Sequence, residues 1–259
     1  TQYRLQITPR DRADNVGGPW IARGQTPVQR AIAAAFQSRW VVGGARSRDA
    51  AYEGEAETVY LGCWPRASFE RFGTFDEALV RNQDDEHNLR LRLAGGRIWQ
   101  STRIRSEYAP RDSLGLLFRQ QFQYGYWRPF VLRKHGQPGS VRQLIPMIFI
   151  AACALSISAA AWFPLFFWLL VASYGLYLVL ASWQAARAAG GGWTLAWRLP
   201  LVIAAYHFGY GLGEWRGLWD GATPLVLRPG STAEVSRILA IADETGTAIV
   251  TQSGNTGLV

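Results

Sequence analysis

The stretch RNQDDEHNLRLRLAGG, residues 81–96, places three consecutive carboxylates, 84–86, at the start of a segment with helical apolar spacing. Adjacent acids repel one another, so the arrangement is costly unless a cation, a sugar hydroxyl or a helix N-terminus uses the charge. Leu89 and Leu93 lie four residues apart, and Leu91 and Ile98 continue the apolar side, which predicts an amphipathic helix held against a core. A helix held in this way can aim one carboxylate at a ligand.

A plainer interpretation of the acidic run stays open beside this one. Carboxylates in a first helical turn complement the helix dipole and need no ligand. Asp85 and Glu86 are also spaced to pair with Arg90 and Arg92 further along the same helix.

The apolar residues of this 259-residue chain gather in its second half, although 49% of the whole sequence is hydrophobic. Residues 144–183 include no charged side chain, and at ~20 residues per crossing this run is long enough for two membrane helices. Pro164 marks the turn between them. A third segment, 199–213, is long enough only if it recruits residues 193–197. We predict a transmembrane region over residues 144–216, with two or three spans at about 144–163, 165–183 and 195–213.

The formal charge of +8 lies entirely before the first predicted span. No run of basic residues interleaves with stacked aromatics, so we expect no nucleic-acid partner. Four cations immediately precede the span: Arg128, Arg133, Lys134 and Arg142. The positive-inside rule then predicts a multi-pass protein of the inner (plasma) membrane, with its soluble part in the cytoplasm and the cations near anionic lipid headgroups.

Apolar periodicity and glycine punctuation predict an α/β soluble part over residues 1–135. The predicted helices are 27–37, 68–72, the acidic helix and 113–133, and the predicted strands are 41–44, 58–63 and 98–104.

The third apolar segment repeats glycine every fourth residue, at Gly209, Gly213 and Gly217. Small residues at this spacing allow two helices to approach closely. His207, just before them, is either a functional side chain or a hydrogen-bonded packing histidine.

Several motifs in a fixed order resemble the acceptor half of family 2 glycosyltransferases. They are Gly-x-Phe-Asp-Glu at 73–77, Gln-Asp-Asp-Glu at 83–86 and Arg-x-Arg-x-Ala-Gly-Gly-Arg-Ile at 90–98. More narrowly, residues 14–18, 42–46, 58–62 and 120–125 look like the exopolysaccharide (succinoglycan-type) branch, and the resemblance covers roughly residues 11–217. It implies an incomplete half of a GT-A, nucleotide-diphospho-sugar transferase fold.

The resemblance also implies a reaction, inverting transfer of a sugar from a nucleotide sugar to a polysaccharide or lipid-linked acceptor. In this family a carboxylate takes the proton of the acceptor hydroxyl, a role that requires position and ionisation. The base implied here is Asp84, the second residue of the family's Glu-Asp pair, written Gln83-Asp84 in this chain.

The substrate-binding residues implied by the resemblance are Asp85, Gln123 and Trp127. Residues 123–127 fall where related processive enzymes carry Gln-x-x-Arg-Trp, with Tyr126 in place of the arginine. Trp127 is expected either to stack on a sugar face or to anchor the chain at the membrane interface.

No metal ligand is assigned. Family 2 enzymes use an Asp-x-Asp motif for Mg²⁺ or Mn²⁺, which neutralises the departing diphosphate, and this sequence contains no Asp-x-Asp. The cation is therefore expected only for a full transferase, of which this chain would be a truncated part. Cys63 and Cys153, one in the soluble part and one in a span, predict neither a disulfide nor a zinc site.

Residues 222–259 predict a separate strand-helix-strand tail, with a helix capped at Ser231 or Thr232 and ending at Gly246. This tail resembles the start of the FAD-binding (PCMH-type) domain of FAD-linked oxidases. The implied FAD contacts are Gln252, Ser253, Gly254, Asn255, Thr256 and Gly257, and FAD is expected only if the domain is complete. An FAD-binding oxidoreductase and an inactive fusion or fragment are therefore the alternative functions.

Overall fold

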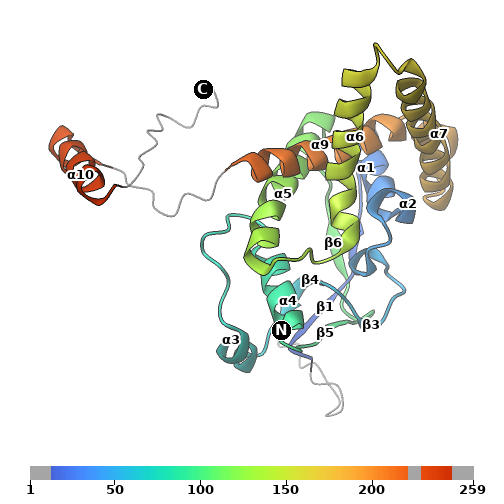
Figure 1. Ribbon diagram of the computed structural model, residues 1–259. Helices are drawn as coiled ribbons and strands as arrows, with labels where there is room; N and C mark the ends of the chain where they lie inside the picture. Colours follow the sequence, from blue (N-terminus) through green and yellow to red (C-terminus); the bar gives the residue numbers. More distant parts are fainter. Residues whose placement is uncertain (1–12, 221–228, 247–259) are drawn as a thin grey trace. The chain divides into compact units, whose positions relative to one another are not determined.

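The structure, a computed structural model, describes residues 13–220 and 229–246 (Figure 1). The chain divides into two compact units, Thr1–Gly221 and Ala222–Val259, and each is described by itself.

The strands of the first unit are short. In chain order they are β1 (Asn15–Gly18), β2 (Trp20–Ala22), β3 (Gly54–Glu55), β4 (Tyr60–Cys63), β5 (Ile98–Gln100) and β6 (Ser106–Tyr108). The helices are α1 (Pro27–Gln37), α2 (Arg39–Val42), α3 (Arg66–Phe72), α4 (Gln83–Leu93), α5 (Leu114–His135), α6 (Ile145–Ala159), α7 (Pro164–Ala188), α8 (Gly192–Ala196) and α9 (Leu199–Trp219), with 3₁₀ turns η1 (Arg46–Arg48) and η2 (Val141–Leu144).

Strand β1 lies inside a mixed four-stranded sheet of order β3-β5-β1-β4. It runs parallel to β5, with Val16 opposite Trp99, and antiparallel to β4, with Val16 opposite Cys63. A second sheet pairs β2 with β6 in parallel. A Cβ on Gly18 would lie 1.7 Å from the carbonyl oxygen of Ile104, so this position between the sheets requires glycine.

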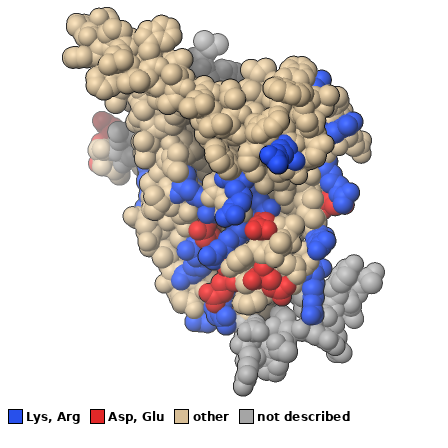
Figure 2. Space-filling model, turned by 90° about the vertical axis from the view of Figure 1, so that its right-hand side faces the viewer, with Lys and Arg blue, Asp and Glu red and all other residues tan. Residues whose placement is uncertain are grey.

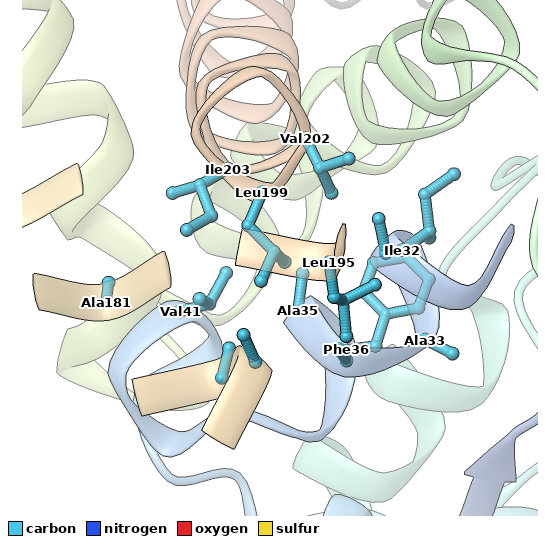
Figure 3. Close-up of a cluster of buried hydrophobic side chains, with 14 of the residues drawn as sticks. Ile32, Ala33, Ala35, Phe36, Val41, Ala181, Leu195, Leu199, Val202 and Ile203 are labelled. Carbon is cyan, nitrogen blue, oxygen red and sulfur yellow. The ribbon is translucent and has the colours of Figure 1, made fainter. Parts of the chain in front are cut away.

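The largest apolar core joins the α/β part to the later helices. Ile32 and Phe36 of α1 are buried beside Leu199 and Ile203 of α9, and Ala181 of α7 belongs to the same cluster (Figure 3). Helix α1 begins at a capping box formed by Thr26 and Gln29. Because one core takes side chains from α1, α7, α8 and α9, the last three of these helices are fixed against the α/β part.

Helices α5 and α9 pack unusually closely because glycines face the opposing backbone. A Cβ on Gly125 would lie 2.0 Å from the carbonyl oxygen of Tyr210, and a Cβ on Gly213 would lie 2.1 Å from that of Phe122. The four-residue glycine repeat of α9 therefore makes the close approach that its spacing predicts.

Two helical segments, Val141–Ala159 and Pro164–Ala188, are long and apolar enough to cross a membrane, by length and composition. Pro164 begins the second, as the predicted turn requires. In Figure 2 the upper part of the molecule is mostly uncharged, with a few Lys or Arg side chains toward its right, while most of the charged side chains in view gather across the lower half. The third predicted span, 195–213, corresponds to α8 and most of α9, which bury one side against α1 and α5; its crossing stays a prediction.

Two local strand predictions were wrong. Residues 41–44 form the end of α2 followed by Gly43 and Gly44 at φ 68° and 69°, because two consecutive left-handed glycines interrupt an extended strand. The predicted strand 98–104 stops at Gln100, where β5 ends. On the predicted apolar side of α4, Leu89, Leu91 and Ile98 are buried as expected, whereas Leu93 is 49% exposed.

In the second unit, α10 (Thr232–Thr245) begins and ends as predicted. The Ser231 hydroxyl caps it by accepting from the backbone N–H of Glu234, and Gly246, at φ 63°, terminates it. The flanking predicted strands and the predicted FAD contacts at 252–257 lie outside the described residues.

Candidate active site

The first turn of α4 is fixed to α5 by the residue that precedes it. Asn82 adopts a left-handed conformation, φ 62° and ψ 21°, which asparagine tolerates better than most residues. Its side-chain nitrogen donates to the carbonyl oxygen of Tyr124 at 3.1 Å, and its own carbonyl accepts from the backbone N–H of Glu86 at 2.9 Å. The acidic run therefore starts from a defined backbone position.

The three consecutive carboxylates point in different directions, because successive helical residues are separated by about 100°. Asp85 accepts a hydrogen bond from Arg128 at 2.8 Å. Glu86 is fully buried and ion-pairs with Arg90 at 3.0 Å and Lys134 at 2.9 Å. Asp84 has no ion-pair partner within the described part of the chain, and its side chain lines a cavity.

The pairing predicted within the acidic helix holds for Glu86 but not for Asp85, which pairs with Arg128 of α5 instead. Glu86 pairs with Arg90 as its spacing predicts, and it also accepts from His135 at 2.8 Å. Although burial opposes ionisation, hydrogen bonds from Arg90, Lys134 and His135 hold the pKa of Glu86 below its usual value. Glu86 thus holds α4 against the end of α5.

Asp84 has the opposite electrostatic environment. The surrounding protein and the nearby charge of Asp85 raise the pKa of Asp84 to about 6, against the effects of backbone N–H groups in the helix turn and of Arg128. This carboxylate is ionised at neutral pH, yet it takes up a proton more readily than an ordinary aspartate does.

The cavity has a volume of about 590 Å³ and joins the soluble part to the apolar helices. The charged residues Asp84, Asp85 and Arg128 form part of its polar wall. Its other walls are aromatic and come from α6, α7 and α9; they include Phe149, Tyr174, Tyr177, Tyr206 and Tyr210. Such a space accommodates a ligand with both a polar and an apolar part.

Helix α5 presents a different face to this cavity from the one expected. Its lining residues are Gln120, Gln121, Tyr124 and Arg128, which recur at helical spacing. Gln123 and Trp127 belong to another face and do not line the cavity; Trp127 packs against Phe130 with ring centroids 5.2 Å apart. Helical phase therefore separates the expected motif residues from the space beside Asp84.

Arg128 is the functional candidate that sequence reasoning missed, because it was counted with the cations before the membrane. It is 9% exposed, and its Nε donates to the hydroxyl of Tyr210 at 3.0 Å while Nη2 donates to Asp85. The signal that identifies it is its position four residues after Tyr124 on the cavity-lining face.

His207 lies in the aromatic wall of the cavity. Its Nδ1 is 3.4 Å from the hydroxyl of Tyr174, and its Nε2 is 3.4 Å from the carbonyl oxygen of Val41. Both ring nitrogens thus have a neighbour, which favours the packing interpretation of this histidine.

Comparison with known proteins gives one long match. The chain is 31% identical over 215 residues to the succinoglycan biosynthesis protein ExoA of Rhizobium meliloti (strain 1021). The match covers 80% of this chain. It covers 62% of the relative, so the chain spans less than two thirds of that protein's length. This similarity supports the predicted likeness to the succinoglycan-type branch.

A shorter match links part of the chain to a second group of proteins. Over 46 residues the chain is 50% identical to probable mitochondrial D-2-hydroxyglutarate dehydrogenases of Oryza sativa subsp. indica and subsp. japonica. These residues make up 18% of this chain and 8% of each relative. No family model and no solved structure matches the chain.

The described residues do not fit a divalent cation. No group of three His, Cys, Asp or Glu side chains gathers anywhere in the part of the chain that the structure describes. The one acidic pair on the cavity is Asp84 and Asp85, and Asp85 already accepts from Arg128. The metal expected for a full transferase stays a prediction.

The cations before the first apolar helix have partners within the protein. Arg133 donates to the carbonyl oxygen of Asp220 at 3.0 Å, and Arg142 ion-pairs with Glu57. Lys134 pairs with Asp76 at 2.6 Å as well as with Glu86. Because Arg133 and Lys134 are also exposed, the contact of this cluster with anionic headgroups stays a prediction.

Proposed function

We propose that this chain is part of a membrane-anchored, inverting glycosyltransferase that transfers a sugar from a nucleotide sugar to a saccharide or lipid-linked acceptor in exopolysaccharide synthesis. The observation that carries the proposal is the position of Asp84. It lines a ligand-sized cavity without an ion-pair partner in the described residues, while its two acidic neighbours are held by α5. The similarity to a succinoglycan biosynthesis protein supports the same reaction class.

In the proposed step, the acceptor hydroxyl attacks the anomeric carbon of the donor sugar from the face opposite the diphosphate. The new glycosidic bond forms as the bond to the diphosphate oxygen breaks, and the diphosphate leaves with that electron pair. Asp84 takes the hydroxyl proton. A carboxylate with a pKa of about 6 is ionised at neutral pH and serves as base once the hydroxyl becomes acidic in the transition state.

Arg128 and Asp85 act as positioning residues in this proposal. Their ion pair fixes the guanidinium beside Asp84, and the hydroxyl of Tyr210 holds it from α9. We assign the sugar contacts on α5 to Gln121 and Tyr124, which line the cavity. The roles implied for Gln123 and Trp127 have no support from the position of either side chain.

The aromatic walls favour an acceptor with an apolar part. Phe149 of α6 and Tyr177 of α7 line the same cavity as Asp84, and both helices expose most of their large apolar side chains. A sugar acceptor carried on a lipid would place its hydroxyl at the polar residues and its chain toward these helices. The proposed location is the inner membrane, with the α/β part on the cytoplasmic side.

Transfer of radiolabelled sugar from a panel of nucleotide sugars into a lipid extract tests this function. Membranes carrying the full chain are compared with Asp84→Asn and with Glu77→Gln, which replaces an exposed carboxylate that does not line the cavity. We expect incorporation with the wild type and Glu77→Gln, and a loss of at least about 100-fold with Asp84→Asn. Equal incorporation by all three would refute the assigned base.

A second candidate, an FAD-binding oxidoreductase, rests on the tail. The 46-residue similarity to dehydrogenases and the capped helix α10 favour a flavin-domain start there. A purified protein in which this tail continues into a complete flavin domain should then retain a flavin absorbance band after incubation with FAD and desalting. A protein that emerges colourless would remove this candidate.

A further inference from the structure

The charged side chains that line the cavity leave one cation without a carboxylate partner. Three arginines contribute to the lining: Arg48, Arg128 and Arg142. Arg128 pairs with Asp85 and Arg142 pairs with Glu57. Within the described residues, Arg48 makes no ion pair.

Arg48 is held in place by aromatic rings instead. Its guanidinium carbon lies 4.3 Å from the ring centroid of Trp20 and 5.0 Å from that of Phe36. Stacking of this kind orients the planar guanidinium group without using its N–H donors. Burial lowers the pKa of the guanidinium, although the neighbouring tyrosines and the charge of Asp85 act in the opposite direction.

One N–H donor of the Arg48 guanidinium has no acceptor among the described residues. The Nη1 atom of Arg48 is shielded from solvent and makes no hydrogen bond within the described residues. A buried donor left unpaired costs about 1–3 kcal/mol, more when it is charged. An anionic ligand that accepts from Nη1 would remove this cost.

The surroundings of Arg48 indicate the kind of anion. Arg48 also lines a second, smaller cavity of about 380 Å³, which has Arg39 and Arg46 in its wall. A rigid fork of N–H donors matches the oxygens of phosphate, and neighbouring cations suit an anion of more than one charge. Asp84, the carboxylate without an ion-pair partner, lines the first cavity together with Arg48.

We propose that Arg48 binds a phosphoryl or diphosphoryl group of a substrate at the wall between the two cavities. This inference rests on the proposed function and deepens it by naming a binding residue outside the motifs that carry the family resemblance. The group has two sources, the diphosphate of a nucleotide sugar and the phosphate of a lipid-linked acceptor.

Binding to the purified full chain in detergent tests the proposal with three probes: inorganic diphosphate, UDP and undecaprenyl phosphate. The variants are Arg48→Gln, Arg48→Lys and the control Arg119→Gln, which removes an exposed arginine of α5 that lines neither cavity. We expect Arg48→Gln to bind at least one probe at least tenfold more weakly than wild type. Arg119→Gln should bind like wild type, and Arg48→Lys, which keeps the charge without the fork, should fall between.

The probe that is lost identifies the source. Weaker binding of UDP and diphosphate assigns Arg48 to the donor, and weaker binding of undecaprenyl phosphate alone assigns it to the acceptor. Wild-type affinity of Arg48→Gln for all three probes, or no binding of any probe by the wild type, overturns the proposal. Should Arg48→Gln fail to fold, as judged by its melting temperature, the same criterion applies to Arg48→Lys.

The outcome is separable from that of the proposed function. If Asp84→Asn loses sugar transfer while Arg48→Gln binds the anions as wild type does, this inference is refuted and the proposed transferase function is retained. If anion binding depends on Arg48 while Asp84→Asn transfers sugar at the wild-type rate, the anion site is supported and Asp84 is refuted as the base.

Discussion

Arg128 of α5 donates to the carboxylate of Asp85 at 2.8 Å, and this pair fixes the wall of the cavity beside Asp84. Arg128 and Asp85 neutralise each other within the protein. The adjacent Asp84, which has no ion-pair partner in the described residues, is therefore the carboxylate available to a ligand. Removing the partner of a buried charge costs more than removing both, because the remaining charge is left uncompensated.

Arg128→Met should therefore both destabilise the protein and reduce sugar transfer, since it leaves Asp85 beside Asp84 without its cation. Arg128→Lys keeps the charge but cannot bond Asp85 and Tyr210 with one rigid fork, so we expect stability near that of wild type and transfer reduced about tenfold. Melting temperature and initial transfer rate are the measurements. If Arg128→Lys transfers at the wild-type rate, the fork has no positioning role.

The pH dependence of transfer should follow Asp84. A base must be ionised, so the rate should rise as pH increases through about 6 and level off above it. The profile of kcat/KM between pH 5 and 8 measures this. A rate that is flat across this interval would argue against Asp84 as base.

The stability of the protein should depend on the ionisation of Asp84 in the opposite direction, falling as pH rises. The native pKa of Asp84 lies above the ordinary value of 3.8, so the native state binds the proton more tightly than the unfolded chain. Stability is then lost as pH rises from about 4 to 6. Asp84→Asn removes this effect, and its melting temperature should equal or exceed that of wild type at pH 7 while the two converge at low pH.

Glu86 should matter for stability rather than for chemistry. It is fully buried with Arg90, Lys134 and His135 around it, so Glu86→Ala should cost about 3–5 kcal/mol. Glu70→Ala is the matched control, because Glu70 makes the same i,i+4 contact with an arginine at the surface and should cost under about 1 kcal/mol. Thermal unfolding in detergent compares the two, and similar costs would contradict the role given to Glu86.

The contribution of Glu86 should also depend on pH in a defined direction. Its native pKa is below the ordinary value of 4.5, so the stabilisation is present above that pH and is lost as pH falls further. The gap in melting temperature between wild type and Glu86→Gln should shrink on acidification below about pH 4.5.

Close packing of α5 on α9 should be sensitive to a single methyl group. Gly125→Ala places a carbon 2.0 Å from the carbonyl oxygen of Tyr210, so the helices must separate and the contact between Arg128 and Tyr210 must lengthen. Gly115→Ala, near the start of the same helix, meets nothing within 4 Å and should be neutral or stabilising. We expect lower melting temperature and lower transfer only for Gly125→Ala; matching values for both variants would contradict the packing.

Local sequence signals predicted some elements well. Helix α1 was predicted over the residues it occupies, because Ile32 and Phe36, four residues apart, define one face. The acidic helix and the turn at Pro164 followed from similarly local chemistry. The segment 41–44 did not, because two apolar residues suggest a strand while the left-handed glycines that follow end a helix.

The face of α5 that lines the cavity and the partners of its side chains could not be predicted from neighbouring residues in the sequence. Arg128 is 43 residues from Asp85 and 82 residues from Tyr210, and only the fold brings the three together. The same holds for Arg48, whose role depends on which neighbours leave it unpaired. A charge count along the chain placed Arg128 beside a membrane, whereas its contacts place it in the cavity wall.

The most direct test of the central claim is the single-turnover rate of labelled-sugar transfer by Asp84→Asn, measured beside wild type and with melting temperature as the check on folding. A general base contributes about 10²–10⁴-fold, so the rate should fall by at least about 100-fold in a variant that is as stable as wild type. A folded Asp84→Asn that transfers within about twofold of the wild-type rate would contradict the account.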